Sequence, residues 1–191
     1  MRDACVDQAF RIIADVGIEK LSLRDVARRL GVSHQAPYKH FANRDHILAE
    51  VVARCFDDFR HALEAARAAA PEDPRSALSA LGLAYFDYAR IHPLEYRLMF
   101  GTPLPDKESH PRMMASARHA FALLQEVLTD MPVSDAGAPS AALDALFVWS
   151  TIHGLATILQ SDALATIGLT DQERAQAIAR CMDRIGLALQ P

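Results

Sequence analysis

The segment 21–50 constrains the fold more than any other part of the chain. Its apolar residues fall at i, i+3, i+4 and i+7, as Leu23, Val26, Ala27 and Leu30. This spacing places them on one face of an amphipathic helix. Ser22 suits the N-cap of that helix, and Gly31 follows it directly, where many helices end in a left-handed residue. The pattern predicts a helix over 23–30 and then a sharp turn.

A second, shorter helix is expected over residues 33–40. Ser33 suits its N-cap, and Phe41 would close a small core behind it. Pro37 lies inside the predicted first turn, so we expect this helix to begin late or as a tight turn. Two short helices joined at a glycine corner predict a helix-turn-helix, which presents one short helix to the DNA major groove.

The side chains expected on the second helix are almost all hydrogen-bonding groups: His34, Gln35, Tyr38, Lys39 and His40. Glutamine suits adenine edges, lysine suits guanine edges or phosphate, and tyrosine and histidine suit phosphate. A reading helix is therefore one interpretation of this segment. The alternative is a solvated connector between two core helices.

In these residues the chain resembles the TetR family of transcriptional regulators. The matching positions are Ala9-Phe10, Gly17, Leu23–Gly31, Val32-Ser33 and Tyr38-Lys39-His40-Phe41. The resemblance implies base contacts from the second helix and Arg24, and phosphate contacts from Tyr38, His40 and Arg44. Ala36-Pro37 departs from the family's more common pair. The residues predicted to contact DNA are Ser22, Arg24, Ser33, His34, Gln35, Ala36, Tyr38, Lys39, His40 and Arg44.

The charge of the chain is unevenly distributed. The whole sequence has a net charge of −4, which is unusual for a DNA-binding protein. Within residues 22–44, however, five basic residues stand against one acidic residue. Positive charge is thus concentrated where phosphates would lie, and this is what governs steering and backbone contact.

The rest of the chain predicts an all-α protein, because no alternating strand pattern occurs in it. About nine helices are expected, over residues 3–16, 23–30, 33–40, 44–69, 74–91, 93–100, 109–130, 140–160 and 171–189. Asp73-Pro74 and the capping box Thr170–Glu173 mark two of the helix starts. We expect a DNA-binding domain over 1–48 and an effector-binding and dimerisation domain over 49–191.

An aromatic constellation lies in the second predicted domain. Trp149, His153 and Gly154 resemble the TetR C-terminal domain type named after its Trp, His and Gly. A small, largely apolar or aromatic effector is expected in a pocket lined by Tyr85, Tyr88, Met99, Phe100, Phe121, Trp149 and His153. The alternative is that these residues are ordinary core, since an aromatic stripe at helical spacing usually is.

The last two long helices carry more apolar residues than one small bundle needs. We expect them to form a two-fold seam, as the resemblance also implies. The residues predicted at this homodimer interface are Phe147, Leu155, Ile178, Met182 and Ile185.

Other functions find little support in the sequence. It contains no HExxH, Walker A or GxSxG motif, and its eight histidines are scattered, so no catalysis, cofactor or metal is expected. The three cysteines show no CxxC spacing, which suits a reducing cytoplasm, and we expect no membrane span or signal peptide. The expected function is a repressor that binds an inverted-repeat duplex and is released by a small molecule. The alternatives are a helical-bundle enzyme or a DNA-independent interaction protein.

Overall fold

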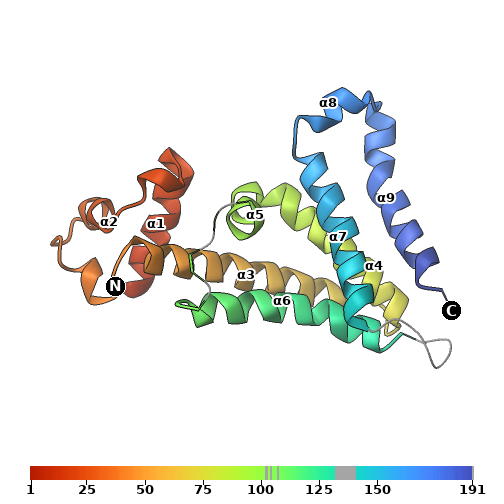
Figure 1. The fold of residues 1–191 in the computed structure, drawn as a ribbon, viewed down its shortest axis with the longest axis horizontal. Helices are drawn as coiled ribbons and strands as arrows, with labels where there is room; N and C mark the ends of the chain where they lie inside the picture. Colours follow the sequence, from red (N-terminus) through yellow and green to blue (C-terminus); the bar gives the residue numbers. More distant parts are fainter. Residues whose placement is uncertain (102, 104, 107, 132–140, 191) are drawn as a thin grey trace. The chain divides into compact units, whose positions relative to one another are not determined.

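The computed structural model describes residues 1–101, 103, 105–106, 108–131 and 141–190. Helices joined by turns make up this part of the chain, with no strand among the described residues (Figure 1). The α-helices are α1 (Arg2–Val16), α2 (Leu23–Leu30), α3 (Arg44–Ala69), α4 (Pro74–Ile91), α5 (Pro93–Phe100), α6 (Pro111–Thr129), α7 (Ala141–Leu159), α8 (Ala163–Ile167) and α9 (Asp171–Ala188). Two short 3-10 helices, η1 (Ile18–Lys20) and η2 (Pro37–Lys39), complete the described elements. The predicted all-α fold is confirmed.

Several helices begin where the local sequence satisfies their first backbone N–H groups. The side chain of Asp73 accepts a hydrogen bond from the Ser76 N–H at 2.9 Å, and Pro74 occupies the first turn of α4. At α9 the Thr170 hydroxyl accepts from the Glu173 N–H at 3.2 Å, while the Glu173 carboxylate accepts from the Thr170 N–H at 2.8 Å. Both starts follow the predicted caps because a cap depends on residues within one turn.

The described α-helices of at least eight residues number eight, against about nine expected. The missing one is the helix predicted over 33–40, of which the structure forms η2 alone. The short helix α8 was not predicted. The composition of residues 131–139, rich in proline, glycine and serine, predicts a linker there, and this segment falls almost wholly outside the described residues.

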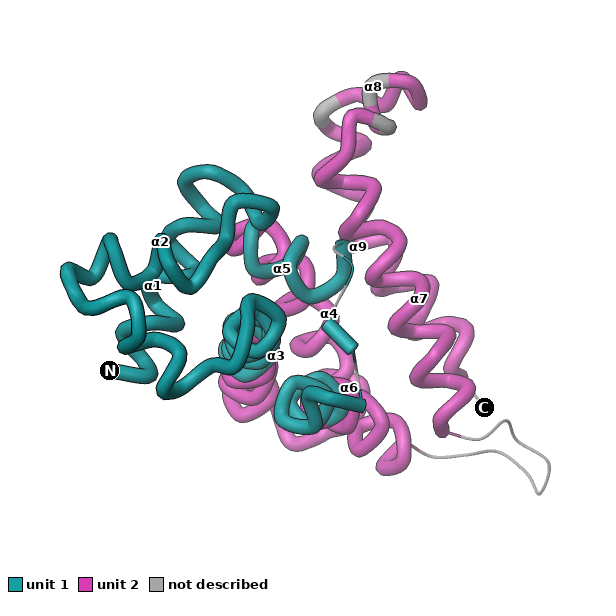
Figure 2. The backbone as a smooth tube through the Cα atoms, turned by 60° about the vertical axis from the view of Figure 1, so that its left-hand side comes forward, with its two compact units in different colours: residues 1–58, 94–118 teal, residues 59–93, 119–191 magenta. Residues whose placement is uncertain are grey.

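The chain forms two compact units (Figure 2). Unit 1 contains residues 1–58 and 94–118, and unit 2 contains residues 59–93 and 119–191. In unit 1, α1 packs on α2 and η1, and α2 packs on η2. Its core contains side chains that are 1% exposed or less, among them Ile12, Val26, Ile47, Leu98 and Met113. Burial of each such side chain contributes roughly 1.5–3 kcal/mol.

In unit 2, α4 packs on α7 and α9, and α7 packs on α9. Val127, Val148 and Ile185 are among its most buried residues. The contact between α4 and α9 depends on a missing side chain, because a Cβ at Gly82 would lie 2.4 Å from the Cε atom of Met182. Glycine at this position lets the methionine of α9 lie directly on the backbone of α4.

The sequence predicted no apolar stretch long enough to span a membrane, and α7 departs from that prediction. By length and composition it is apolar enough to cross a membrane, and 22% of its most apolar window is buried. A single helix of this kind is weak evidence for a span, because core helices of soluble proteins have the same composition. What the helix does show is large apolar side chains in solvent, among them Leu143, Leu146 and Phe147.

Candidate functional site

The first half of the helix-turn-helix is fixed by its two ends. The Ser22 hydroxyl accepts a hydrogen bond from the Asp25 N–H at 3.1 Å, which caps α2. Gly31 ends the helix with φ +66° and ψ +27°, and its N–H reaches the Ala27 and Arg28 carbonyls. Glycine adopts this left-handed conformation without the strain that a side chain would add. The chain therefore turns at the predicted corner.

The second half is a tight turn followed by η2, and Pro37 explains why an α-helix does not form there. In an α-helix over 33–40, the N–H of residue 37 would donate to the Ser33 carbonyl, but proline has no N–H. That carbonyl instead accepts from the Ala36 N–H at 2.9 Å, one residue earlier. The hydrogen bonds of this segment thus begin with a 3-10 turn, which agrees with the predicted late or tight start. The full helix expected over 33–40 was wrong.

The segment 33–41, named the reading segment after its predicted role, has a buried side and an exposed side. Pro37 is buried and Phe41 is 2% exposed, and the Phe41 N–H donates to the Pro37 carbonyl at 3.0 Å. Of the residues predicted to contact DNA, Arg24, Ser33, His34, Gln35, Tyr38, Lys39 and His40 are exposed, whereas Ser22, Ala36 and Arg44 are half-buried. The two buried residues anchor the segment and leave its polar side chains in solvent.

The cations around this segment differ in whether they form ion pairs or hydrogen bonds within the chain. Arg28 pairs with Asp25 at 2.6 Å, and Arg29 pairs with Asp15 at 2.5 Å. Arg44 donates to the Ile18 carbonyl at 2.8 Å, so its guanidinium holds η1 as well as lying at the start of α3. For Arg24 and Lys39, no ion pair is present within the described part of the chain. These two cations are therefore the best placed to bind phosphate or guanine.

The aromatic residues of unit 2 form one connected cluster. The Tyr85 hydroxyl and His153 Nδ1 are hydrogen-bonded at 2.8 Å. The Trp149 ring centroid lies 5.6 Å from that of His153 and 5.8 Å from that of Phe121. On the other side, Phe59 contacts Tyr85 and Tyr88 edge-on, each at 5.1 Å. Five of the predicted pocket residues thus come together from α4, α6 and α7, around a phenylalanine of α3.

The polar member of this cluster is uncharged near neutral pH. Burial lowers the pKa of His153 below its usual 6.5, because the charged imidazolium loses hydration inside the unit. Its Nδ1 atom is engaged by Tyr85. An aromatic surface with a neutral hydrogen-bonding pair suits an apolar ligand with one or two polar groups.

The two remaining predicted pocket residues, Met99 and Phe100, belong to unit 1. Met99 is 2% exposed, and the Phe100 ring lies edge-on to Phe56 at 5.6 Å. Sequence reasoning did not find Phe59, because its position within the long helix α3 gives no signal beyond that of an ordinary core residue.

A separate groove of about 560 Å³ lies in unit 2. It is lined by parts of α3, α4 and α6, including Glu64, Arg67, Ala77, Leu123 and Val127. None of its lining residues belongs to the aromatic cluster. Among the described residues, no group of three or more His, Cys, Asp or Glu side chains is arranged to hold a metal ion.

The predicted dimer residues divide into two groups. Phe147 is exposed and Leu155 half-buried on α7. On α9, Ile185 is 1% exposed and so packs inside the chain, whereas Ile178 is half-buried and Met182 is half-buried against Gly82. The large apolar side chains that α7 leaves in solvent are Leu143, Leu146, Phe147 and Ile158, which are 41% to 59% exposed. They share one helical face with Gly154, where an added Cβ would meet nothing within 4 Å.

Two family matches cover most of the chain. Residues 6–51 match the family described as bacterial regulatory proteins of the tetR family, and residues 78–185 match the tetracyclin repressor-like C-terminal domain. The second match alone spans more than half of the chain. It is compatible with the Trp-His-Gly type of C-terminal domain, which stays a prediction.

Individual relatives agree with these matches. The chain is 29% identical over 107 residues to an HTH-type transcriptional regulator of Mycobacterium tuberculosis, covering 56% of this chain and 46% of the relative. It is 36% identical over 98 residues to the tetracycline repressor protein class C of Escherichia coli, covering 48% and 43%. The matched region thus spans about half the length of these relatives. A solved structure from Rhodococcus sp. RHA1, of unknown function, is 28% identical with a TM-score of 0.76, covering 96% of this chain and 92% of that one.

Proposed function

The chain belongs to the TetR family of bacterial transcriptional regulators, and from that premise we propose that it is a ligand-responsive repressor that binds an inverted-repeat operator as a homodimer. The observation that carries this proposal is the division of the reading segment. Pro37 and Phe41 hold it from behind, while His34, Gln35 and Lys39 extend into solvent. Because the buried residues fix its backbone, such a segment presents donors and acceptors to base edges without a change in its fold.

Binding to an inverted repeat requires a second copy of the chain in this proposal. Each protomer offers one reading segment, so an inverted repeat is read by two copies related by a two-fold axis. The exposed face of α7 supports the same arrangement, because Leu146, Phe147 and Ile158 leave an apolar surface that a partner would cover. Gly154 on this face would allow two α7 helices to approach closely.

The effector site in this proposal is the aromatic cluster of unit 2. Trp149 and Phe121 offer flat apolar surfaces, and the Tyr85–His153 pair offers a hydrogen bond. We expect the effector to be a small, largely apolar molecule. It must favour the state that cannot bind DNA, since equal affinity for both states shifts nothing.

The domain assignment is part of the same proposal. Residues 1–48 would read DNA, and residues 49–191 would bind the effector and the second copy. Helix α3 runs without interruption from Arg44 to Ala69 and so belongs to both. An effector would shift this helix and move the two heads out of register with their half-sites. The protein would act in the cytoplasm, where the bacterial chromosome lies.

The test is selection of bound fragments from random duplex DNA by the purified protein, repeated with candidate small molecules. We expect an inverted repeat with half-site centres about 34–36 Å apart, or a multiple of that distance. Absence of any duplex binding at low salt would refute the proposal. Binding that no small molecule changes, across a chemically broad set, would remove the ligand-responsive part alone.

A further inference from the structure

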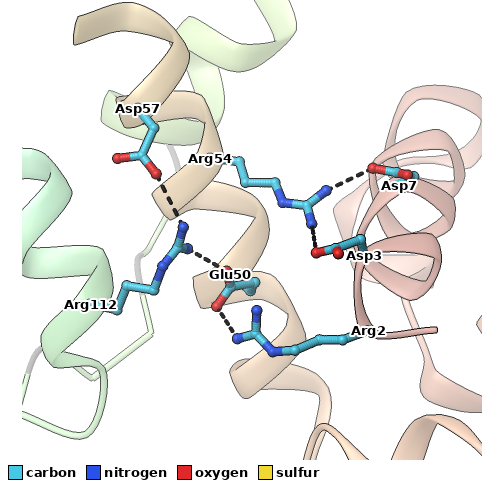
Figure 3. A network of polar contacts seen from close by, with 7 residues as sticks. All are labelled: Arg2, Asp3, Asp7, Glu50, Arg54, Asp57 and Arg112. Atoms are coloured by element: carbon cyan, nitrogen blue, oxygen red, sulfur yellow. Dashed lines mark hydrogen bonds and ion pairs between the residues drawn. The ribbon is translucent and has the colours of Figure 1, made fainter.

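The carboxylate of Glu50 lies between two arginines from different helices of unit 1 (Figure 3). Arg2 of α1 donates to its Oε2 atom at 2.5 Å, and Arg112 of α6 donates to its Oε1 atom. The side chain of Glu50 is 8% exposed. Residues far apart in the sequence thus meet at one buried charge on α3.

The contacts around Glu50 join α3 to α6 on one side and to α1 on the other. The second amino group of Arg112 donates to Asp57 at 3.1 Å, two turns farther along α3. On the side of α1, Arg54 pairs with Asp3 at 2.5 Å and with Asp7 at 2.7 Å. Within this network, drawn in Figure 3, Glu50 is the group that binds both α1 and α6.

The network also reaches the reading segment. The guanidinium of Arg2 lies 5.5 Å from the ring centroid of Phe41, the residue that closes the core behind η2. Beside it, the buried ring of His110, which directly precedes α6, contacts the ring of His46 edge-on at 4.9 Å. The segment at the start of α6 therefore contacts α3 at two places, through His110 and through Arg112.

We propose that Glu50 and Arg112 are positioning residues for DNA binding, which hold the reading head in the orientation that fits DNA by fixing the start of α6 to α1 and α3. This inference rests on the proposed reading of DNA by the head. Its physical basis is that a buried carboxylate strongly resists the loss of one of its cations, so the contact is either made or broken. Helix α6 is continuous from Pro111 to Thr129, so a shift of this helix is transmitted to Arg112.

The principal test is Arg112→Gln, with Arg118→Gln as the matched control from the exposed surface of the same helix. The probe is a duplex that the wild-type protein selects from a random pool. We expect Arg112→Gln to weaken its binding at least about fivefold, within the usual range of coupling between sites. The slope of affinity against salt should not change, because no phosphate contact is lost. Arg118→Gln should bind as the wild type does.

Two further variants test whether the effect passes through Glu50. Glu50→Gln should weaken binding in the same way. The double variant should be weakened by less than the product of the two single effects, since both variants remove the contact between Arg112 and Glu50. Circular dichroism at the assay temperature establishes that each variant is folded. If Arg112→Gln does not fold, Arg112→Lys replaces it, because lysine keeps the charge and loses the fork that spans Glu50 and Asp57.

Hydrogen exchange distinguishes a positioning role from a purely structural one. Adding the duplex should slow amide exchange over residues 111–118 in the wild type and in Arg118→Gln, but not in Arg112→Gln. The inference is overturned if Arg112→Gln binds DNA normally, if its salt slope falls by about 1 as for a phosphate contact, or if it keeps the exchange response. Weakened binding by Lys39→Ala alongside normal binding by Arg112→Gln would overturn this inference alone. Failure of the wild type to bind any duplex would overturn it together with the proposed function.

Discussion

The hydroxyl of Tyr85 and the Nδ1 atom of His153 lie 2.8 Å apart and join α4 to α7 inside the aromatic cluster. The pKa of His153 is lowered by burial, so its ring is held in the neutral form that can accept or donate one hydrogen bond at each nitrogen. This pair connects the stability of unit 2 to pH.

Stability should fall as the solution is acidified. Because the folded pKa of His153 lies below the unfolded value of about 6.5, its contribution is complete above that pH and is lost as the pH falls through the folded pKa. Thermal unfolding between pH 8 and pH 5 should show a steeper loss in the wild type than in His153→Gln. His119→Gln, which changes an exposed histidine of α6, is the control and should follow the wild type. Parallel curves for wild type and His153→Gln would contradict the assignment.

Trp149 should report effector binding, because it is the single tryptophan and it lies against Phe121 and His153. An active effector should change its emission, and operator DNA should weaken that response. The reciprocal coupling is expected at about 1–3 kcal/mol, or roughly 5–150-fold in DNA affinity. If Trp149→Phe and His153→Ala leave the potency of a known effector unchanged, the binding site lies elsewhere, and the groove lined by Arg67 and Leu123 becomes the next candidate.

Lys39→Ala should weaken binding to all duplexes similarly and lower the salt slope by about 1, if its ammonium contacts phosphate. Gln35→Ala and His34→Ala should instead change which sequences are selected. Titrations at several salt concentrations separate the two effects. Arg90→Ala removes an exposed cation from α4 and should alter neither slope nor preference.

A charge on the exposed face of α7 should prevent dimerisation. Phe147→Glu would place a carboxylate in the seam, where a partner helix would desolvate it. Sedimentation of this variant at micromolar concentration should show monomers. Leu83→Glu is the control, since Leu83 is 46% exposed on α4 and Phe147 is 42% exposed on α7. A monomeric wild type, or two variants with the same dimer content, would refute the proposed seam.

Replacing Gly31 by alanine should destabilise the head by about 1–2 kcal/mol, the usual strain of a side chain in the left-handed region. No steric clash adds to this, because a Cβ there meets nothing within 4 Å. Gly31→Asn should be less destabilising, since asparagine tolerates this conformation better. Urea unfolding of both variants measures the difference, and equal midpoints for alanine and glycine would show that the turn relaxes.

The features that sequence predicted correctly depend on residues within about one helical turn of each other. The cap at Ser22, the corner at Gly31 and the box between Thr170 and Glu173 are all of this kind. The sequence also showed the polar character of residues 33–40, whose contact with DNA stays a prediction. The full helix over 33–40 was wrong, because Pro37 lacks the N–H that its first hydrogen bond needs. Local chemistry was sufficient for these elements.

The features that sequence could not predict are contacts over long separations. Glu50 meets Arg2 and Arg112 across 48 and 62 positions, and no spacing rule pairs one carboxylate with two particular arginines. The same holds for Phe59 in the aromatic cluster, and for the membership of Met99 and Phe100 in unit 1. These depend on how helices pack, which periodicity alone does not determine.

The separation of buried anchors from exposed readers has an evolutionary consequence. Pro37 and Phe41 shape the reading segment from its buried side, whereas His34, Gln35 and Lys39 contribute little to that packing. Duplicated copies of such a gene can therefore diverge at the exposed positions, acquire new operators and regulate new genes. Each intermediate along that path would still be a folded protein.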